Sequence, residues 1–356
     1  MLKSKKVNFG NVSLSSSEKI GLISNMHTML TAGIPILETV ESLLDGAKGN
    51  QKKILETLKE DLSQGSHIYA SFAKFPHVFD KVTVSILKAS EEAGKLDETL
   101  KDLAENVKRE AEFSDKIRSA LIYPSFIMVV FFGVMLMILI VVIPKISTVF
   151  SRLNVKLPLP TKIMIGASNI LLHQTVPLVI GLVIIVAGMV FLYKRQKYAL
   201  IRIMTSLPVV SNLTREIDIT RFARSFYLLL SAGIPITSAL ELVVDVVVKK
   251  DVKQALIECK NNVSAGKKLS EGFKSNKKIF PNIMIKITEA GEKSGTLDKS
   301  MQDASDFMDY QVSNSLKLVT ALIEPIMLVF VGAMVGGMML AIIAPIYGLI
   351  GQVGPR

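Results

Sequence analysis

Residues 30–36 read LTAGIPI, and residues 230–236 read LSAGIPI. Seven positions recur with a single change, from Thr to Ser, at a separation of 200 residues in a chain of 356. Self-similarity at a fixed separation is the signature of a duplicated structural unit. The first question is therefore how far the duplication extends.

The repeated stretch itself has the composition of a junction between two helices. Gly33 and Gly233 suit the left-handed cap at the end of a helix, and Pro35 and Pro235 suit the first turn of the next helix. We interpret both stretches as helix punctuation rather than as a ligand loop used twice.

The resemblance continues to the C-terminal part of the chain. SEEAGKLDETL at 90–100 matches GEKSGTLDKSM at 291–301, and ALIYP at 120–124 matches ALIEP at 321–325, both at an offset of 201. By contrast, the FP element that begins at Phe75 matches the one at Phe280 at an offset of 205. We therefore expect two compensating four-residue slips around this element, in loops that tolerate them.

Apolar and charged residues are segregated along the chain, which reconciles a mean hydropathy of +0.42 with 21% charged residues. Residues 119–144 and 163–193 carry no charge, and residues 318–355 carry only Glu324. About 20 apolar residues in a helix span a bilayer. We predict three transmembrane helices, at residues 119–144, 176–193 and 318–345.

The second predicted span has no counterpart in the repeat and follows the first span before the second copy begins. Two crossings therefore separate the two soluble copies, and both lie on one side of the membrane. Basic residues flank the first span on its N-terminal side and the second on its C-terminal side, which favours a cytoplasmic location for both copies. Four basic residues within 145–162 weaken this orientation argument. The predicted order is a tail (1–14), a cytoplasmic bundle (15–118), a transmembrane helix (119–144), a periplasmic loop (145–175), a transmembrane helix (176–193), a second cytoplasmic bundle (194–317), a transmembrane helix (318–345) and a periplasmic tail (346–356).

Both soluble copies have the pattern of small antiparallel helical bundles, so the fold class is an all-α membrane protein. Ser15 and Glu18 can form a capping box. Gly94 and Gly295 end one helix in each copy, and Asp97 and Asp298 are candidate N-caps for the next. We expect that next helix to continue into the membrane without a break. The β-branched stretch 241–252 is also predicted to be helical.

The sequence has no pattern of an enzyme. There is no phosphate-binding loop, no His-Glu-x-x-His, and no histidine cluster. The only cysteine, Cys259, excludes an intrachain disulfide. The acidic patch can be a weak divalent-cation site or a solvated turn with a helix cap. It consists of Glu91, Glu92, Asp97 and Glu98.

Two features of the third predicted span point to packing and anchoring. Glu324 precedes Pro325 near the start of the span and is either a functional ionisable group or a structural anchor. Gly332, Gly336 and Gly337 offer a flat face for close helix packing, between two chains or between two helices of one chain.

The two soluble copies differ in charge. Residues 1–118 hold 17 basic and 17 acidic side chains, whereas residues 194–319 hold 20 basic and 13 acidic ones. The five lysines within 267–278 are either solvated or contact an acidic partner or anionic lipid. They lack the neighbouring base readers expected of a nucleic-acid-binding protein.

Together these motifs resemble the type II secretion F / type IV pilus PilC family, most clearly in KIRSALIYP at 116–124 and GEKSGTLD at 291–298. Ser90 departs from the glycine at the start of the second motif. The resemblance implies six-helix bundles and a non-enzymatic, self-associating platform protein of the bacterial inner membrane, without a cofactor. The implied partners are a cytoplasmic hexameric assembly ATPase, pilin or pseudopilin, and inner-membrane alignment proteins.

A small-solute transporter subunit and a membrane receptor or regulator are the alternative functions, and both pilus assembly and type II secretion fit the motifs. For the platform reading, the structural and coupling positions are Gly33, Pro35, Gly94, Tyr123, Pro124, Pro144, Gly233, Pro235, Glu292, Gly295, Glu324, Pro325 and Pro345. We expect the prolines at membrane entry to set the angle at which each long helix enters the bilayer.

Overall fold

The structure is a computed structural model that describes residues 12–152, 159–173 and 208–353. Throughout these residues the regular structure is helical, without a β-strand. The predicted transmembrane helix at 176–193 lies outside the described residues. Two compact units can be distinguished, and they are described separately.

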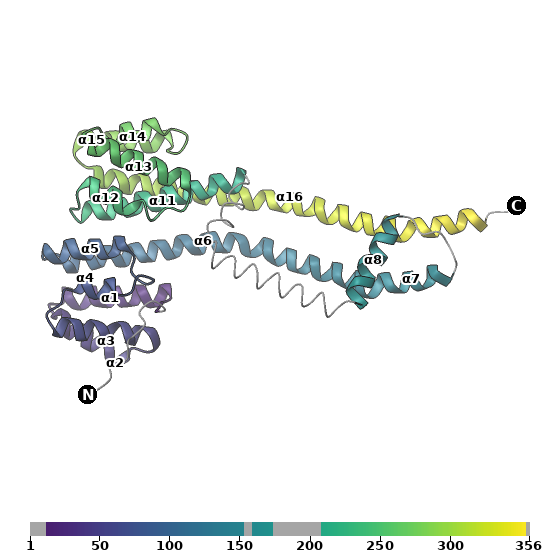
Figure 1. The fold of residues 1–356 in the computed structure, drawn as a ribbon, viewed down its shortest axis with the longest axis horizontal. Coiled ribbons are helices and arrows are strands. Elements are labelled where there is room, and N and C mark those ends of the chain that lie inside the picture. Colours follow the sequence, from purple (N-terminus) through teal and green to yellow (C-terminus); the bar gives the residue numbers. More distant parts are fainter. Residues whose placement is uncertain (1–11, 153–158, 174–207, 354–356) are drawn as a thin grey trace. The chain divides into compact units, whose positions relative to one another are not determined.

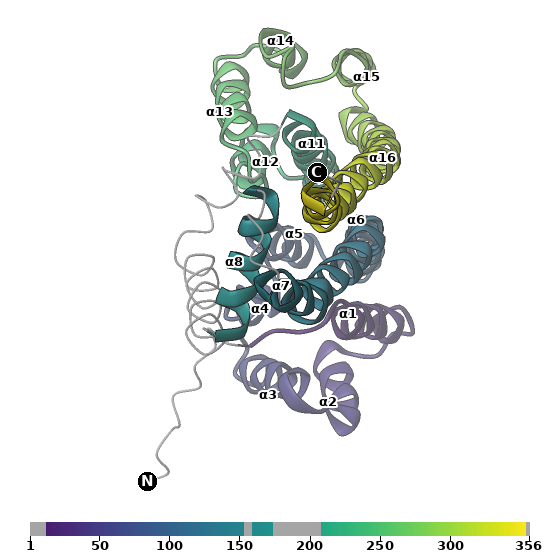
Figure 2. The same cartoon turned by 90° about the vertical axis from the view of Figure 1, so that its right-hand side faces the viewer.

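The first unit contains both soluble copies, each built from five complete helices and the first part of a sixth (Figure 1, Figure 2). The helices of the first copy are α1 (Ser16–Thr31), α2 (Ile36–Gly46), α3 (Gly49–Ser63), α4 (Ile68–Ala73), α5 (Lys81–Glu92) and α6 (Leu96–Met137). Those of the second copy are α11 (Pro208–Ser231), α12 (Ile236–Val243), α13 (Lys250–Ser264), α14 (Leu269–Ser275), α15 (Asn282–Ser294) and α16 (Leu297–Val353). The six helices per copy agree with the expectation from the family resemblance.

Each bundle is centred on an equivalent pair of buried phenylalanines. The rings of Phe72 and Phe79 lie 4.2 Å apart between centroids, and those of Phe273 and Phe280 also lie 4.2 Å apart. All four side chains are fully buried. Burying a phenylalanine contributes about 1.5–3 kcal/mol, so these pairs are a major source of stability in each copy.

The two copies are aligned at a constant offset of 201 through the FP region, so the expected four-residue slips are wrong. The N–H of Phe79 donates to the carbonyl of Phe75 at 2.9 Å, and the N–H of Phe280 donates to that of Asn276 at 3.0 Å. Phe79, not Phe75, is therefore the counterpart of Phe280. The two FP dipeptides therefore lie at different places in the two bundles. The equivalent position is the buried phenylalanine, which is followed by proline only in the second copy.

Among the described helices of the two copies, the offset changes from 200 to 201 between α12 and α13. The prediction of a continuous helix over 241–252 is wrong at the same place. The helix α12 ends at Val243, and the next begins at Lys250. The intervening backbone is held by Asp218 of α11, whose carboxylate accepts the N–H groups of Val248 at 3.1 Å and Lys249 at 2.7 Å. This tertiary contact overrides the helical pattern inferred from the first copy.

The helix punctuation expected from the repeated stretch is present in both copies. Gly33 has φ +81° and Gly233 has φ +79°, a left-handed conformation that favours glycine. The residue after each glycine donates its N–H back into the preceding helix, at 3.0 Å in both copies. Pro35 and Pro235 lie at the N-cap, one residue before the predicted first turn, because their carbonyls accept the first hydrogen bond of the new helix.

Other caps are partly as predicted. Ser15 and Glu18 form the capping box of α1. Gly94 and Gly295 have φ +68° and +73° and end α5 and α15. The N-cap prediction for the two aspartates that follow these glycines is wrong, because both lie inside the first turn of their helices, where a carboxylate favours the positive end of the helix dipole. These residues are Asp97 and Asp298.

The second unit contains the apolar parts of the two long helices. They run without interruption from the first unit, as expected, through Pro124 in α6 and Pro325 in α16. By length and composition, Leu96–Thr148 and Leu297–Gly337 contain segments that can cross a membrane. Phe131 and Phe330 make an edge-to-face contact between these helices, with their centroids 5.6 Å apart.

After α6 the chain forms a π-helical turn η2 (Ile138–Val142), then α7 (Ile143–Arg152) and α8 (Leu159–His173). Much of the predicted loop at 145–175 is therefore helical, and Pro144 continues a helix rather than ending one.

Candidate functional site

Glu91 and Glu292 perform the same structural task in the two bundles. The carboxylate of Glu91 accepts the N–H of Ile68 at 3.0 Å and that of Tyr69 at 3.2 Å, at the start of α4. The carboxylate of Glu292 accepts the N–H and the hydroxyl of Ser270 at the start of α14. These glutamates therefore hold the short helix of each copy against the glycine-capped helix that follows it, α5 or α15.

Within the acidic patch, the Glu91 carboxylate is occupied by these backbone contacts. Both oxygens of Glu91 serve α4, and the carbonyl of Asp97 faces Nδ1 of His27 at 2.9 Å. Among the described residues, no three metal-ligating side chains come together.

Near the start of its apolar segment, each long helix contains a proline with an exposed neighbour. Pro124 and Pro325 have no N–H for the carbonyl four residues earlier, so each removes one hydrogen bond from its helix. Tyr123 is 54% exposed, and Glu324 is exposed as well. The large apolar side chains around them are also exposed, as expected of a surface that faces lipid or other membrane helices.

Pro144 has a different local role, because it follows the π-helical turn. The N–H of Ile143 bonds to the carbonyl of Ile138, five residues earlier. At the same spacing Pro144 would pair with Leu139 but has no N–H to donate. The hydroxyl of Ser168 in α8 donates to the Leu139 carbonyl instead, at 2.6 Å. This contact joins α8 to the end of the first long helix.

The three glycines in α16 present an open face. A Cβ placed on Gly332, Gly336 or Gly337 meets no other atom of the described residues within 4 Å. Helix packing through these glycines remains a prediction, and either another chain or another helix of this chain fits it. Pro345 lies inside α16, near its C-terminal end.

The five lysines at 267–278 lie on both sides of α14 and within it. Lys274 pairs with Glu289 at 3.2 Å, and the Lys278 carbonyl accepts a hydrogen bond from Arg215 at 2.8 Å. The helix α14 lies between the two ends of the sequence cluster.

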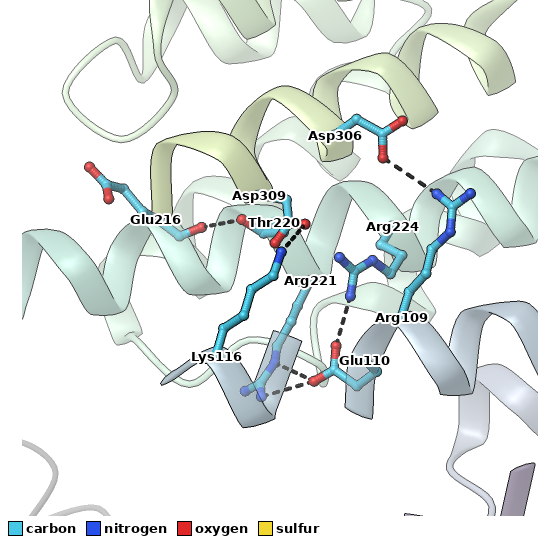
Figure 3. Close-up of polar contacts among 9 residues, drawn as sticks. All are labelled: Arg109, Glu110, Lys116, Glu216, Thr220, Arg221, Arg224, Asp306 and Asp309. Carbon is cyan, nitrogen blue, oxygen red and sulfur yellow. Dashed lines mark hydrogen bonds and ion pairs between the residues drawn. The ribbon is translucent and has the colours of Figure 1, made fainter. Parts of the chain in front are cut away.

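A cluster of ion pairs joins the two copies, and the sequence patterns did not predict it (Figure 3). Glu110 of α6 bridges two arginines of α11. Its Oε1 lies 2.9 Å from Nη2 of Arg221, and its Oε2 lies 3.1 Å from Nη1 of Arg224. The Arg224 guanidinium also lies 5.4 Å from the ring centre of buried Phe113, a cation–π contact.

Three further ion pairs connect the copies around this centre (Figure 3 shows the two on α16). They are Lys81–Asp245 at 2.8 Å, Arg109–Asp306 at 3.4 Å and Lys116–Asp309 at 3.5 Å. Lys81 and Lys253 on either side hold the pKa of the Asp245 carboxyl below its usual range. The Lys81–Asp245 and Arg109–Asp306 pairs are exposed, so each contributes little stability by itself. Lys116 is exposed as well, but its partner Asp309 is half-buried.

A cleft of about 750 Å³ opens beside this interface. Its lining combines α5 and α6 of the first copy with α11 and α12 of the second, and it includes Glu110, Arg221 and Arg224. The burial of Lys19 near this region lowers the pKa of its amine, and Asp80 and Glu110 act in the opposite direction.

The duplication seen in the fold coincides with a duplicated family match. The family model described as Type II secretion system (T2SS), protein F matches residues 22–144 and again residues 222–345. The chain belongs to the type II secretion system protein F family. Each match covers one copy of the repeat together with the apolar segment that follows.

Relatives of this family come from both pilus and secretion systems. The type IV pilus assembly protein PilC of Pseudomonas aeruginosa is 29% identical over 333 residues, covering 92% of this chain and 89% of the relative. The PilC of Thermus thermophilus is 29% identical over 332 residues, covering 91% and 80%. The type II secretion system protein F of Vibrio cholerae is 28% identical over 335 residues, covering 93% and 82%. The chain is thus a protein F/PilC-type platform component of membrane machinery, a structural family rather than an enzyme family.

Proposed function

We propose that this protein couples a cytoplasmic assembly ATPase to the extraction of pilin or pseudopilin subunits from the inner membrane and their addition to a fibre. The observation that carries the proposal is the continuity of α6 and α16, each of which runs from a folded bundle into an apolar segment. A continuous helix transmits displacement along its axis, so movement of a bundle reaches the membrane segment directly. The family membership supports a platform role for this arrangement.

The proposal places both bundles in the cytoplasm, where they contact the ATPase, and the C-terminus in the periplasm. The chain crosses the inner membrane three times, with the second crossing at 176–193, and self-associates. Pilin helices and alignment proteins contact the apolar segments, where the side chains of Phe126 and Leu328 are exposed to more than 60%. No observation on the described residues favours a transporter subunit or a receptor.

A purification test addresses the partner. The full-length protein, extracted in detergent from a strain that assembles fibres, is expected to retain the assembly ATPase. A reconstituted sample with purified ATPase distinguishes direct contact from contact through other components. Absence of the ATPase in both preparations would contradict the proposal.

A second test addresses the coupling helices. Replacing Pro124 and Pro325 together by Ala restores one backbone hydrogen bond in each long helix and straightens its entry into the membrane. Fibre assembly is expected to fall while membrane insertion and abundance stay normal. Pro76→Ala, in an exposed turn of the first bundle, is the matched control. Normal fibre assembly in the double variant would contradict the lever mechanism.

A further inference from the structure

The contact between Glu110 and the two arginines is specific to the pairing of the copies. At the repeat offsets, the counterparts of these three residues carry no charge; they are Gln311, Gly21 and Ser24. The folding of a single bundle therefore does not require this cluster. The cluster therefore acts on how the two bundles pair with each other.

The cluster combines burial with access to water. Arg224 is 8% exposed, whereas the side chain of Glu110 is 37% exposed and lies in the lining of the cleft. Ion pairs in such positions give little net stability, because desolvation opposes the attraction between the charges. When the two surfaces separate, each charge regains its hydration, so opening this contact costs less than opening an apolar contact of the same size.

The closed interface also leaves polar atoms without protein partners. Asn106 Oδ1 in α6 and Asp309 Oδ1 in α16 are buried and have no hydrogen-bond partner among the described residues. Asn106 lines the same cleft. An unpaired buried acceptor costs about 1–3 kcal/mol, and exposure to water on opening removes that cost.

We propose that Glu110, Arg221 and Arg224 form a reversible electrostatic latch between the two bundles. In the closed state Glu110 bridges the arginines and the bundles move as one body. In the open state the three charges are hydrated, the cleft widens, and each bundle moves with its own long helix. The latch is a property of this chain alone; its use in the assembly cycle rests on the proposed function.

Distance measurements between spin labels on the two bundles test the latch. Lys53 in α3 and Lys286 in α15 are exposed and have no ion pair among the described residues. The full-length Lys53→Cys/Lys286→Cys protein is labelled in detergent. The native thiol of Cys259 does not interfere, because it is buried and its burial raises its pKa to about 12.

The expected result is a main distance with a minor, longer population. Glu110→Gln keeps the shape of the side chain but removes its charge, and should increase the longer population at least about threefold. Glu112→Gln, at an exposed position on the same helix, is the matched control and should leave the distribution unchanged. Equal distributions in all three proteins would overturn the proposal.

Salt dependence of the protein with native latch residues provides a readout that does not depend on the folding of a variant. Raising the salt concentration from about 0.1 M to about 1 M shortens the screening length from about 10 Å to about 3 Å and should increase the longer population. In Glu110→Gln the same change should have a smaller effect. A single salt-independent distance in the protein with native latch residues would show a rigid interface. Co-purification of the ATPase is scored separately, so failure of the latch and failure of the platform role are distinguishable.

Discussion

Gly291 of α15 lies directly against Ser300 of α16. A Cβ on Gly291 would overlap with the Ser300 hydroxyl and lie 2.6 Å from its Cβ and 3.2 Å from the Leu297 Cα. The glycine is therefore required by close packing of two helices and not by backbone conformation. In the first copy Ser90 occupies this position, is buried, and donates its hydroxyl to the Leu87 carbonyl at 3.0 Å.

Gly291→Ala should destabilise the second bundle. Alanine normally stabilises a helix interior relative to glycine by about 0.5–1 kcal/mol, but overpacking here costs about 1–3 kcal/mol. The midpoint of thermal unfolding, followed by far-UV circular dichroism, should fall. Gly21→Ala in α1 is the control, because a Cβ at that position meets nothing within 4 Å and should not lower the midpoint. A second change, Ser300→Gly, should recover part of the loss; no loss in the single variant would contradict the packing argument.

Glu91 and Glu292 each hold the start of one short helix, so removing either carboxylate should affect only its own copy. Glu292→Ala removes the acceptor for both polar groups of Ser270. Backbone hydrogen exchange in α14 should become at least about fivefold faster, because an unpaired backbone N–H costs about 1 kcal/mol or more. Glu289→Ala is the control, since Glu289 contacts only exposed lysines in α14 and α15. Glu91→Ala should affect α4 and leave α14 unchanged; equal exchange in both copies would contradict the assignment.

Local chemistry made much of this fold predictable. The glycine–proline punctuation, the capping box and the uninterrupted helices into the apolar segments all depend on residues close in sequence, and the structure contains them. The offset at the FP element and the break after Val243 depend on tertiary packing, namely the buried place of Phe79 and the reach of Asp218 to the next loop. Sequence periodicity carries no information about such contacts.

The interface between the copies could not be predicted from the sequence repeat for a related reason. A repeat search rewards positions that are alike, whereas Glu110 and its two arginines differ from their counterparts. A search for charged residues that lack a charged counterpart would have identified them. Their pairing, however, requires helices α6 and α11 to be placed side by side, which only the three-dimensional structure provides.

The contact between Ser168 and Leu139 predicts a rescue experiment. Ser168→Ala removes the donor to a carbonyl that Pro144 cannot serve, and should loosen α8 from η2, seen as faster protease cleavage near residues 159–173. Pro144→Ala restores an N–H at the end of the π-helical turn. The double variant should therefore regain protection, and Ser168→Thr, which keeps a hydroxyl, should behave as the parent protein. If Pro144→Ala does not restore protease protection to Ser168→Ala, the two residues do not act on the same Leu139 carbonyl.

Asp218 predicts how stability changes with pH. Burial raises the pKa of its carboxyl, and hydrogen bonds from Lys249 and Val248 offset only part of this. Because the folded-state pKa lies above the unfolded value of about 3.9, the folded protein holds the proton more tightly. The stabilising contribution is complete below the unfolded pKa and is lost as the pH rises through the folded pKa.

Asp218→Asn keeps an acceptor for the two N–H groups but cannot ionise. As the pH rises from about 4 to about 7, the parent protein loses the stabilising contribution of Asp218 and the variant does not. The unfolding midpoint of Asp218→Asn should therefore rise relative to that of the parent protein over this range. Asp218→Ala removes the acceptor and should be less stable across the whole range, because the loop between α12 and α13 loses both hydrogen bonds. A constant difference between Asp218→Asn and the parent at every pH would show that the buried carboxylate does not titrate as its surroundings require.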